Sequence, residues 1–145
     1  MTLRVELVLP EGEIWAGQAE MVIAKTLDGD IGVLTGHTPV LGILAEGSLV
    51  RIRPEGSPDV AADSTGEVVA AVNGGFFSVA DDRVSILARE AQLGGEVDTR
   101  AARAALDEAL QRAEASGGFG LGEEPEDIRY LRALLRAAGD PADRA

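Results

Sequence analysis

The sequence contains no cysteine, and this absence removes several kinds of chemistry at once. A chain without cysteine has no disulfide framework, no thiol nucleophile and no thiolate metal site. Histidine is nearly absent as well, because His37 is the only one among the 145 residues. A histidine-centred catalytic site would therefore have a single candidate residue.

Basic residues are scarce relative to acidic ones. The 13 Lys and Arg face 25 Asp and Glu, the formal net charge is −12, and Lys25 is the only lysine. Because neutralising phosphates requires clustered cations, this balance argues against a nucleic-acid partner and against contact with anionic lipid.

Long apolar runs are missing too. No run approaches the roughly 18 residues needed to cross a bilayer, so direct membrane insertion is not expected. The first residues combine neither a basic start nor an uninterrupted apolar stretch, which argues against a cleaved secretory signal. We therefore expect a protein that is made and stays in the cytoplasm.

What is present up to about Glu90 is typical of β structure. Short apolar runs are broken by Gly, Pro, Asp and Asn, as in a sandwich or barrel. Residues 3–9 and 48–53 alternate apolar and polar side chains, separate short runs occur at residues 14–15, 20–24 and 32–34, and residues 67–87 predict a final β meander. Residues 54–66 hold no bulky apolar side chain and predict a long exposed hairpin loop. We predict an antiparallel β-sandwich domain over residues 1–90.

The composition changes after Glu90 to Ala, Leu, Arg and Glu, which favour helices, and no further strand is expected. Asp98 or Thr99 can cap a helix that runs to about Ser116, before a glycine-rich segment at residues 117–122. A second helix is predicted from Pro125 to Gly139. Its apolar face carries Ile128, Leu131, Leu134 and Leu135. Residues 91–145 are therefore predicted to form a two-helix hairpin, which makes the chain an α+β protein.

The first of these helices offers mainly alanine to a neighbour. An alanine lacks three carbons of a leucine, which corresponds to about 2 kcal/mol less burial energy. Two readings stay open: a tail that can leave its docking site, or an ordinary well-packed hairpin.

His37 is the first candidate for acid–base work, flanked by Gly36 and Pro39. A triad could be imagined with Ser48, Ser78 or Ser85, but no serine sits in a nucleophile elbow. A turn histidine bonded to neighbouring backbone is the preferred interpretation.

Asp28 and Asp30 could form an acid pair or bind a metal ion. The stretch lacks the remaining oxygen donors of a calcium loop and has no histidine at metal spacing, so no metal site is expected. Two interpretations remain, a solvated turn and an acidic tip that meets a basic partner.

Arg132 and Arg136 lie one helical turn apart on the second helix. Such a pair can bind a phosphate or a carboxylate as a fork, or it can be a plain exposed cationic face. The sequence contains neither of the glycine-rich phosphate-binding motifs, so no nucleotide-hydrolysing site is predicted.

Four motifs in register carry a family resemblance. They are Pro10-Glu11-Gly12-Glu13-Ile14-Trp15-Ala16-Gly17, the stretch from Asp28 to Leu41 with Gly36-His37-Thr38-Pro39, Asn73-Gly74-Gly75-Phe76-Phe77-Ser78-Val79, and Val84-Ser85-Ile86-Leu87-Ala88. In this order, and followed by a helical hairpin, they closely resemble the epsilon subunit of bacterial F-type ATP synthases. The resemblance covers essentially the whole chain.

The resemblance implies a ten-stranded β-sandwich and a non-catalytic role in the rotor of a proton-translocating ATP synthase, peripheral on the cytoplasmic face of the plasma membrane. The implied partners are the gamma subunit and the c subunits of the rotor ring. Its ring-contact residues would be Asp28, Gly29, Asp30 and Ile31, with His37 shaping the backbone behind this acidic loop.

The resemblance also implies regulation, in which the helical hairpin extends toward the catalytic alpha and beta subunits and blocks ATP hydrolysis. Arg129, Arg132 and Arg136 are the residues expected to meet acidic surfaces there.

Some family members bind ATP through a motif of Ile or Leu, Asp, two variable residues and Arg-Ala. This chain keeps Asp98 but has Ala101 at the arginine position, and Arg100 points about 100° away around the helix. Asp98, Arg132 and Arg136 are the remaining candidates for an ATP sensor, and no cofactor is expected.

Overall fold

A computed structural model describes residues 2–56, 59, 61–120 and 124–140. The elements in this part of the chain are nine strands, a single 3-10 turn and two α-helices. The strands are β1 (Leu3–Leu9), β2 (Gly12–Thr26), β3 (Gly29–Leu34), β4 (Val40–Leu44), β5 (Ser48–Pro54), β6 (Val68–Val72), β7 (Gly75–Ala80), β8 (Arg83–Ala88) and β9 (Ala91–Leu93). The helical elements are η1 (Gly94–Glu96), α1 (Thr99–Ala115) and α2 (Glu126–Ala137).

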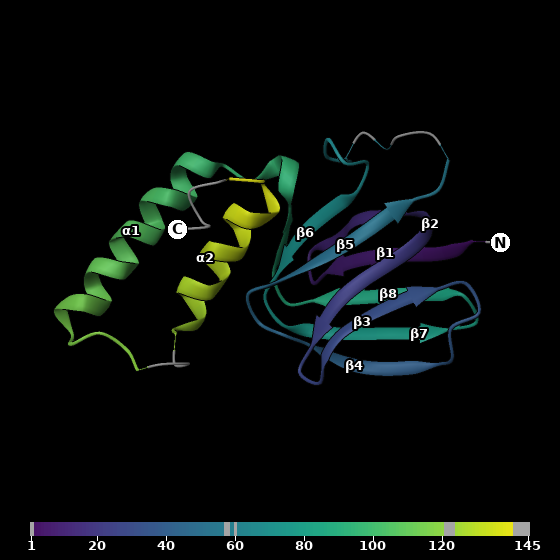
Figure 1. The fold of residues 1–145 in the computed structure, drawn as a ribbon, viewed down its shortest axis with the longest axis horizontal. Coiled ribbons are helices and arrows are strands. Elements are labelled where there is room, and N and C mark those ends of the chain that lie inside the picture. Colours follow the sequence, from purple (N-terminus) through teal and green to yellow (C-terminus); the bar gives the residue numbers. More distant parts are fainter. Residues whose placement is uncertain (1, 57–58, 60, 121–123, 141–145) are drawn as a thin grey trace.

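The strands form two layers that close on each other through β1 and β2 (Figure 1). One layer contains β1, β8, β7 and β4 in that order, and the other contains β2, β5, β6 and β9, with β3 beside β2. Every pair is antiparallel except β1 with β8, which run parallel. The predicted sandwich is therefore confirmed, although the neighbouring positions of the first and eighth strands leave no local signal in the sequence.

The long strand β2 serves both layers. Its first half pairs with β1, from Leu3 opposite Ala19 to Leu9 opposite Gly12, and its second half pairs with β3 and β5. The expectation of two separate runs at residues 14–15 and 20–24 was wrong, because the chain bends at a register shift and continues as one strand. The described residues accordingly contain nine strands where the resemblance implies ten.

The segment from Asp28 to Leu41 is largely strand, although we expected a loop at residues 28–31 and only a short run at residues 32–34. Gly29 already lies in β3 and Val40 begins β4, so only the turn at Leu27 and Asp28 and the connection at residues 35–39 are irregular. The positive φ of this hairpin falls on Gly29, at +115°, which directly follows the turn residues Leu27 and Asp28 and begins β3. A tight hairpin therefore replaces the predicted loop.

The expected meander over residues 67–87 is only half right. The hairpin of β7 and β8 forms as predicted, with Asp81 and Asp82 both at positive φ in its turn. The strands β6 and β7, however, lie in different layers, since β6 pairs with β5 and β9 while β7 pairs with β4 and β8. The connection Asn73-Gly74 therefore crosses between layers.

The sandwich continues past Glu90, where we expected no further strand. Ala91 and Leu93 in β9 are buried, and the strand pairs with β6 from Val72 opposite Ala91 to Ala70 opposite Leu93. A three-residue edge strand is too short to produce a period-2 pattern, so it could not be read from the sequence.

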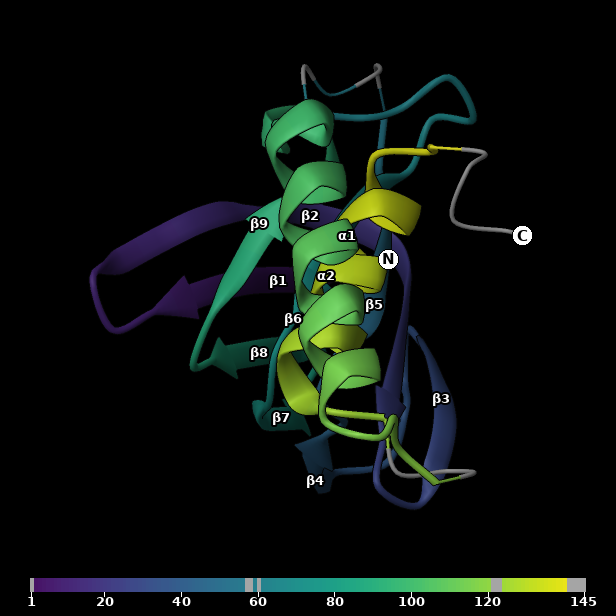
Figure 2. The same cartoon turned by 90° about the vertical axis from the view of Figure 1, so that its left-hand side faces the viewer.

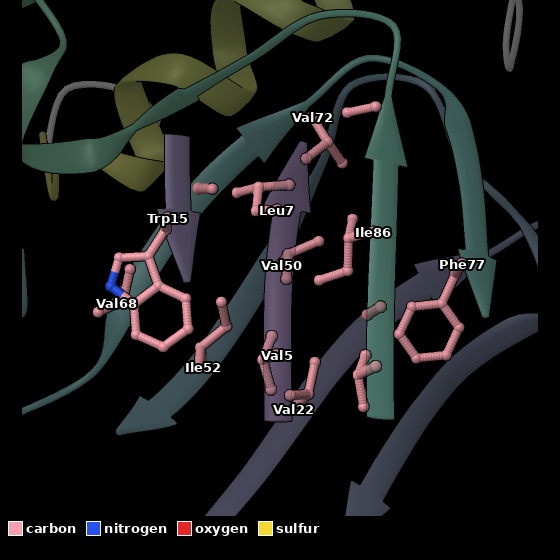
Figure 3. Packing of buried hydrophobic residues seen from close by; sticks show 14 of the residues in the cluster. Val5, Leu7, Trp15, Val22, Val50, Ile52, Val68, Val72, Phe77 and Ile86 are labelled. Carbon is pink, nitrogen blue, oxygen red and sulfur yellow. The ribbon is translucent and has the colours of Figure 1, made fainter. Parts of the chain in front are cut away.

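The core lies between the two layers. Apolar side chains that alternate inward from both layers fill this space, as Figure 3 shows for Val5, Leu7, Val50, Ile52 and Phe77. All five are fully buried. The alternation predicted for residues 3–9 and 48–53 is confirmed by the burial of Leu3, Val5, Leu7, Val50 and Ile52.

The two helices form the predicted hairpin, with α2 between the sandwich and α1 (Figures 1 and 2). Asp98 caps α1 by accepting a hydrogen bond of 3.0 Å from the amide of Ala101. Pro125 precedes α2 and marks its start as expected. No helix in the described ranges is long and apolar enough to cross a membrane.

Each side of α2 buries a different set of side chains. Leu134 packs toward Val69 and Ala71 of β6. Ile128 and Leu135 face α1, where they meet Leu106 and two alanines. The alanine-rich face of α1 thus contributes little bulk, and the buried residues of the cluster that holds α1 all come from the two helices.

The described residues between β5 and β6, after Pro54, contain no helix or strand, and neither do those between α1 and α2. The loop joins β5 to β6 as a hairpin connection, and residues 57, 58 and 60 lie outside the described residues. Residues 121–123 and 141–145 also lie outside them.

Candidate functional site

Large apolar side chains stand in one row on the outer face of the sandwich. Ile43 lies opposite Phe76, Phe76 lies opposite Leu87, and Leu87 lies opposite Val8, across β4, β7, β8 and β1. Leu27 extends the row, since its amide donates a hydrogen bond to the carbonyl of Ile43. We call Val8, Leu27, Ile43, Phe76 and Leu87 the apolar row.

The apolar row is exposed to solvent. Leu27 is 68% exposed, Phe76 55%, Ile43 51% and Leu87 48%, and Val8 is half-buried. The next residue along each strand points into the core, so the row is the outward half of an alternating pattern that is apolar on both faces. An outward face of an antiparallel sheet is ordinarily polar, and a contiguous apolar patch there marks a contact surface.

A groove runs along the apolar row and ends against α2. It has a volume of about 1080 Å³ and is lined by all five residues of the row. Its far wall carries cationic side chains: Arg89 from the sandwich and Arg129, Arg132 and Arg136 from α2. The groove therefore joins an apolar floor to a basic wall.

The tip of the hairpin formed by β2 and β3 borders the same groove. Thr26 Oγ1 donates to the carbonyl of Gly29 at 2.9 Å and accepts from the amide of Asp28 at 3.2 Å, which fixes the turn. Asp28, Gly29 and Asp30 are exposed and Ile31 is half-buried. Asp30 lies opposite Lys25 in the strand register, so its charge faces the only lysine of the chain.

His37 lies at the other end of β3 from this tip. The turn at Asp28 and the connection that carries His37 lie at opposite ends of the six-residue strand β3, about 16 Å apart for five steps of ~3.3 Å. The Nδ1 atom of His37 is 2.7 Å from the carbonyl oxygen of Thr38, and its amide donates to Leu34. The structure therefore does not bring His37 together with Asp28 to Ile31.

Among the described residues, no hydrogen bond joins the ring of His37 to a side chain that could act with it in catalysis. The hydroxyl of Ser48 donates to Ala45 and that of Ser85 donates to Glu6, so neither serves His37. A group of three or more His, Asp or Glu able to hold a metal ion is also absent from the described ranges.

The arginines of α2 contact the sandwich and the segment before the helix. Arg129 pairs with Glu46 at 3.1 Å, and Arg132 pairs with Glu124 at 3.1 Å. Arg136 donates to the carbonyl of Gly47 at 3.2 Å. The three candidates thus lie together on the groove wall, and each has a partner within the chain.

Asp98 does not join them. Its carboxylate caps α1, and it is not among the residues that line the groove. The three candidates for an ATP sensor therefore do not lie in one site. Arg132 and Arg136 line the groove, whereas Asp98 lies at the N-terminal end of α1.

The apolar row and Glu46 are the features that sequence reasoning missed. A signal for the row was present, because Phe76 and Phe77 are adjacent and one of two neighbours in a strand must point outward. Nothing local marks Glu46, since its partners come from segments more than 40 residues away.

The sandwich matches a known family. The family model of the ATP synthase delta/epsilon chain β-sandwich domain covers residues 2–94, which includes β9. By fold and match, the N-terminal part of this chain is a sandwich of that class.

Curated relatives are similar over nearly the whole chain. The ATP synthase epsilon chain of Thermobifida fusca is 50% identical over 137 residues, which cover 94% of this chain and 91% of its own. That of Streptomyces griseus is 44% identical over 92% of this chain and 97% of its own. The epsilon chain of Frankia casuarinae is 50% identical over 93 residues, 64% of this chain and 99% of its own. This chain belongs to the ATP synthase epsilon-chain family.

A solved structure has a similar fold. The cryo-EM structure of the Euglena gracilis mitochondrial ATP synthase, with OSCP, F1 and the c-ring, contains a chain that matches with a TM-score of 0.64 at 22% identity. The match covers 99% of this chain and 81% of that one, so the helices are included in the similarity.

Proposed function

We propose that this chain is a non-catalytic rotor subunit of a proton-translocating ATP synthase, and that the apolar row docks it on the gamma subunit. The row carries the proposal, because it places exposed large apolar side chains side by side on a rigid sheet. Burying such a patch against a partner is favourable at about 25 cal/mol per Å² of apolar surface removed from water. A flat face on a rigid sheet suits a partner with which the subunit turns as one body.

The second proposed contact is made by the exposed hairpin tip. Asp28, Gly29, Asp30 and Ile31 would meet the c subunits of the rotor ring, whose basic residues would attract the acidic tip. His37 lies at the opposite end of β3, and its proposed role is limited to the connection to β4. This contact would weaken as salt rises, because exposed charges are screened. The chain would then be peripheral on the cytoplasmic face of the plasma membrane.

The proposed role of the hairpin is to inhibit ATP hydrolysis when it leaves the sandwich. Arg129, Arg132 and Arg136 would then exchange their present partners for acidic surfaces of the alpha and beta subunits. A two-state element of this kind responds to any partner that binds one state more tightly than the other. The small side chains of α1 leave it lightly packed against α2, which favours separation of the two helices when the hairpin extends.

Reconstitution of the assembled enzyme tests both parts. The tagged chain should co-purify with the gamma subunit, and loss of that association under native conditions would end the rotor assignment. Deletion of residues 96–145 should raise ATP hydrolysis while the sandwich still binds gamma. Unchanged hydrolysis after the deletion would remove the inhibitory role and leave the docking role standing.

A second candidate function is nucleotide sensing by the isolated chain. The observation in its favour is that Arg132 and Arg136 line one groove wall. We expect no tight binding, because Arg132 already pairs with Glu124 and Ala101 replaces the arginine of the family motif. Calorimetry with ATP on the isolated chain checks this: a submicromolar to micromolar affinity would establish a sensor, and millimolar or absent binding would exclude one.

A further inference from the structure

The helix α2 contacts the turn between β4 and β5 through residues outside the apolar row. The proposed docking on gamma therefore does not explain these contacts. The turn contributes Glu46 and Gly47, which meet residues from the crossover after β6, from the end of β8 and from α2. We call the following set the Glu46 latch: Glu46, Gly47, Asn73, Arg89, Glu126 and Arg129.

Both oxygens of the Glu46 carboxylate are engaged by arginines. Arg129 of α2 pairs with Oε2 at 3.1 Å, and Arg89, which follows β8, pairs with Oε1 at 3.4 Å. Arg89 also reaches Glu126 at the start of α2, at 3.1 Å. Positive and negative side chains therefore alternate from Arg129 of α2 to Glu46 of the turn, then to Arg89 of the sandwich and back to Glu126 of α2.

The buried side-chain amide of Asn73 completes this network of ion pairs with hydrogen bonds. Asn73 is 8% exposed, and its side chain donates to Glu126 at 2.9 Å and accepts from the amide of Gly47 at 3.2 Å. Burying an amide side chain is unfavourable unless its polar atoms are bonded, and in the docked hairpin Glu126 accepts from the Nδ2 group of Asn73. The network thus links the helix to the turn through the sandwich itself.

Close backbone approach provides a separate contact. Gly47 has a φ of +62°, and a Cβ atom there would lie 2.7 Å from Cβ and 2.8 Å from the carbonyl carbon of Arg129. Only glycine leaves room for α2 at this point while adopting this backbone conformation. The turn is therefore shaped for the helix by sterics as well as by charge.

We propose that the Glu46 latch holds the hairpin against the sandwich without any bound ligand. The carboxylate of Glu46 pairs with Arg129 and takes the place that the anionic group of a ligand would otherwise occupy. Its regulatory meaning rests on the proposed function, because releasing the latch would free the hairpin to inhibit. Glu46, Gly47, Arg89 and Arg129 also line the groove beside the apolar row. A partner anion entering that groove would compete with Glu46 for Arg129, which links docking to release.

Hydrogen exchange on the full-length chain tests the latch without any partner subunit. Glu46→Gln should speed exchange of the α2 amides about two- to fivefold relative to the wild type, the range for loss of exposed ion pairs. Gly47→Ala should have a larger effect, because the added methyl group collides with α2. Arg112→Gln is the matched control, since it removes an exposed ion pair within α1, to Glu108 at 3.5 Å, that does not touch the sandwich.

A double-variant comparison assigns the effect to the pair. Arg129→Gln alone should match Glu46→Gln, and the two combined should fall short of the product of the single effects. Amides of Val50 and Ile52 in the core report whether the sandwich stays folded. The latch is overturned if α2 exchange in Glu46→Gln equals that in Arg112→Gln, or if the two substitutions act independently.

The outcomes separate this proposal from the proposed function. A chain with an intact latch that fails to bind gamma would contradict the rotor role alone. A chain that binds gamma but has no coupling between Glu46 and Arg129 would contradict the latch alone.

Discussion

Phe76 and Phe77 are neighbours in β7 with opposite surroundings. Phe77 is fully buried between the layers, whereas more than half of Phe76 is exposed in the apolar row. Alternation along a strand forces this division, because successive side chains point to opposite faces. The sequence feature that builds the core thus also builds the apolar row.

Gly75, at the start of β7, sets how closely the strands of this face approach. A Cβ atom there would lie 2.1 Å from the carbonyl oxygen of Leu87, and the φ of +130° disfavours any other residue. We expect Gly75→Ala to lower the free energy of unfolding by about 2 to 4 kcal/mol, from overlap and backbone strain together. Urea unfolding measures this.

Gly32→Ala is the control for Gly75→Ala. Gly32 lies in β3, and a Cβ atom there would meet nothing within 4 Å. Its effect on the free energy of unfolding should stay within about 0.5 kcal/mol. Equal effects of the two substitutions would contradict the close approach at Gly75.

Tyr130 gives a pH-dependent test at a single side chain. Burial, and then the negative charge of Glu90, raise its pKa from 10.0 to about 12. Since the folded state favours the neutral phenol, stability is unaffected below pH 10 and falls as the pH rises from 10 toward 12. Because Tyr130 is the only tyrosine, tyrosinate absorbance reports this residue alone.

The expected titration midpoint is about 12 in the folded chain and about 10 in urea. Glu90→Gln should move the folded midpoint partway toward 10, because burial remains after the charge is removed. A folded midpoint equal to that in urea would show that Tyr130 is not buried against the sandwich.

At the scale of elements, α2 is the helix that joins α1 to the sandwich. Leu134 belongs to the cluster that includes Val69 and Ala71 of β6, whereas Ile128 belongs to the cluster shared with α1. One helix thus presents two apolar surfaces to two neighbours. The more lightly held neighbour is α1, whose contribution is mostly alanine.

Two substitutions should separate these surfaces. Leu134→Ala should release α2 from β6, and Ile128→Ala should release α1 from α2, each at a cost of about 2 to 4 kcal/mol. Hydrogen exchange resolved by segment distinguishes them, since Leu134→Ala should expose the amides of α2 and Ile128→Ala chiefly those of α1. The same exchange pattern in both variants would contradict two separate clusters.

The elements themselves could largely be predicted from the sequence, because strand alternation and helix capping are local. Asp98 caps α1 and Pro125 precedes α2 as expected. What escaped prediction depends on distant partners: the short strand β9 is defined by β6, and the single long β2 pairs with four different neighbours. Local patterns carry no information on such pairings.

The candidate site was predictable to a smaller extent for the same reason. The arginines of α2 were recognised by their helical spacing, but their partners Glu46 and Gly47 lie more than 80 residues earlier. His37 does not lie beside Asp28, because β3 extends between them. Charge and spacing identify candidate residues, whereas the strand register decides which of them meet.

At the scale of the whole molecule, the proposed function gives the sandwich and the hairpin different tasks. The match to the epsilon chain of Frankia casuarinae spans 93 residues, and these are 99% of that chain. The family therefore includes chains much shorter than this one. In the account given above, the sandwich docks and the hairpin regulates. The turn that carries Glu46 follows directly after β4, which carries Ile43 of the apolar row, and so connects the two tasks.

The most direct test of this account measures the affinity of the full chain for the gamma subunit. Phe76→Asp places a charge in the centre of the apolar row and should weaken binding at least about tenfold, as expected for an anchor residue of an interface. Phe119→Asp is the matched control, since Phe119 is also exposed, at 41%, but lies in the linker between the helices. Binding lost in Phe76→Asp and kept in Phe119→Asp is the predicted result. Wild-type affinity in Phe76→Asp would contradict docking through the apolar row.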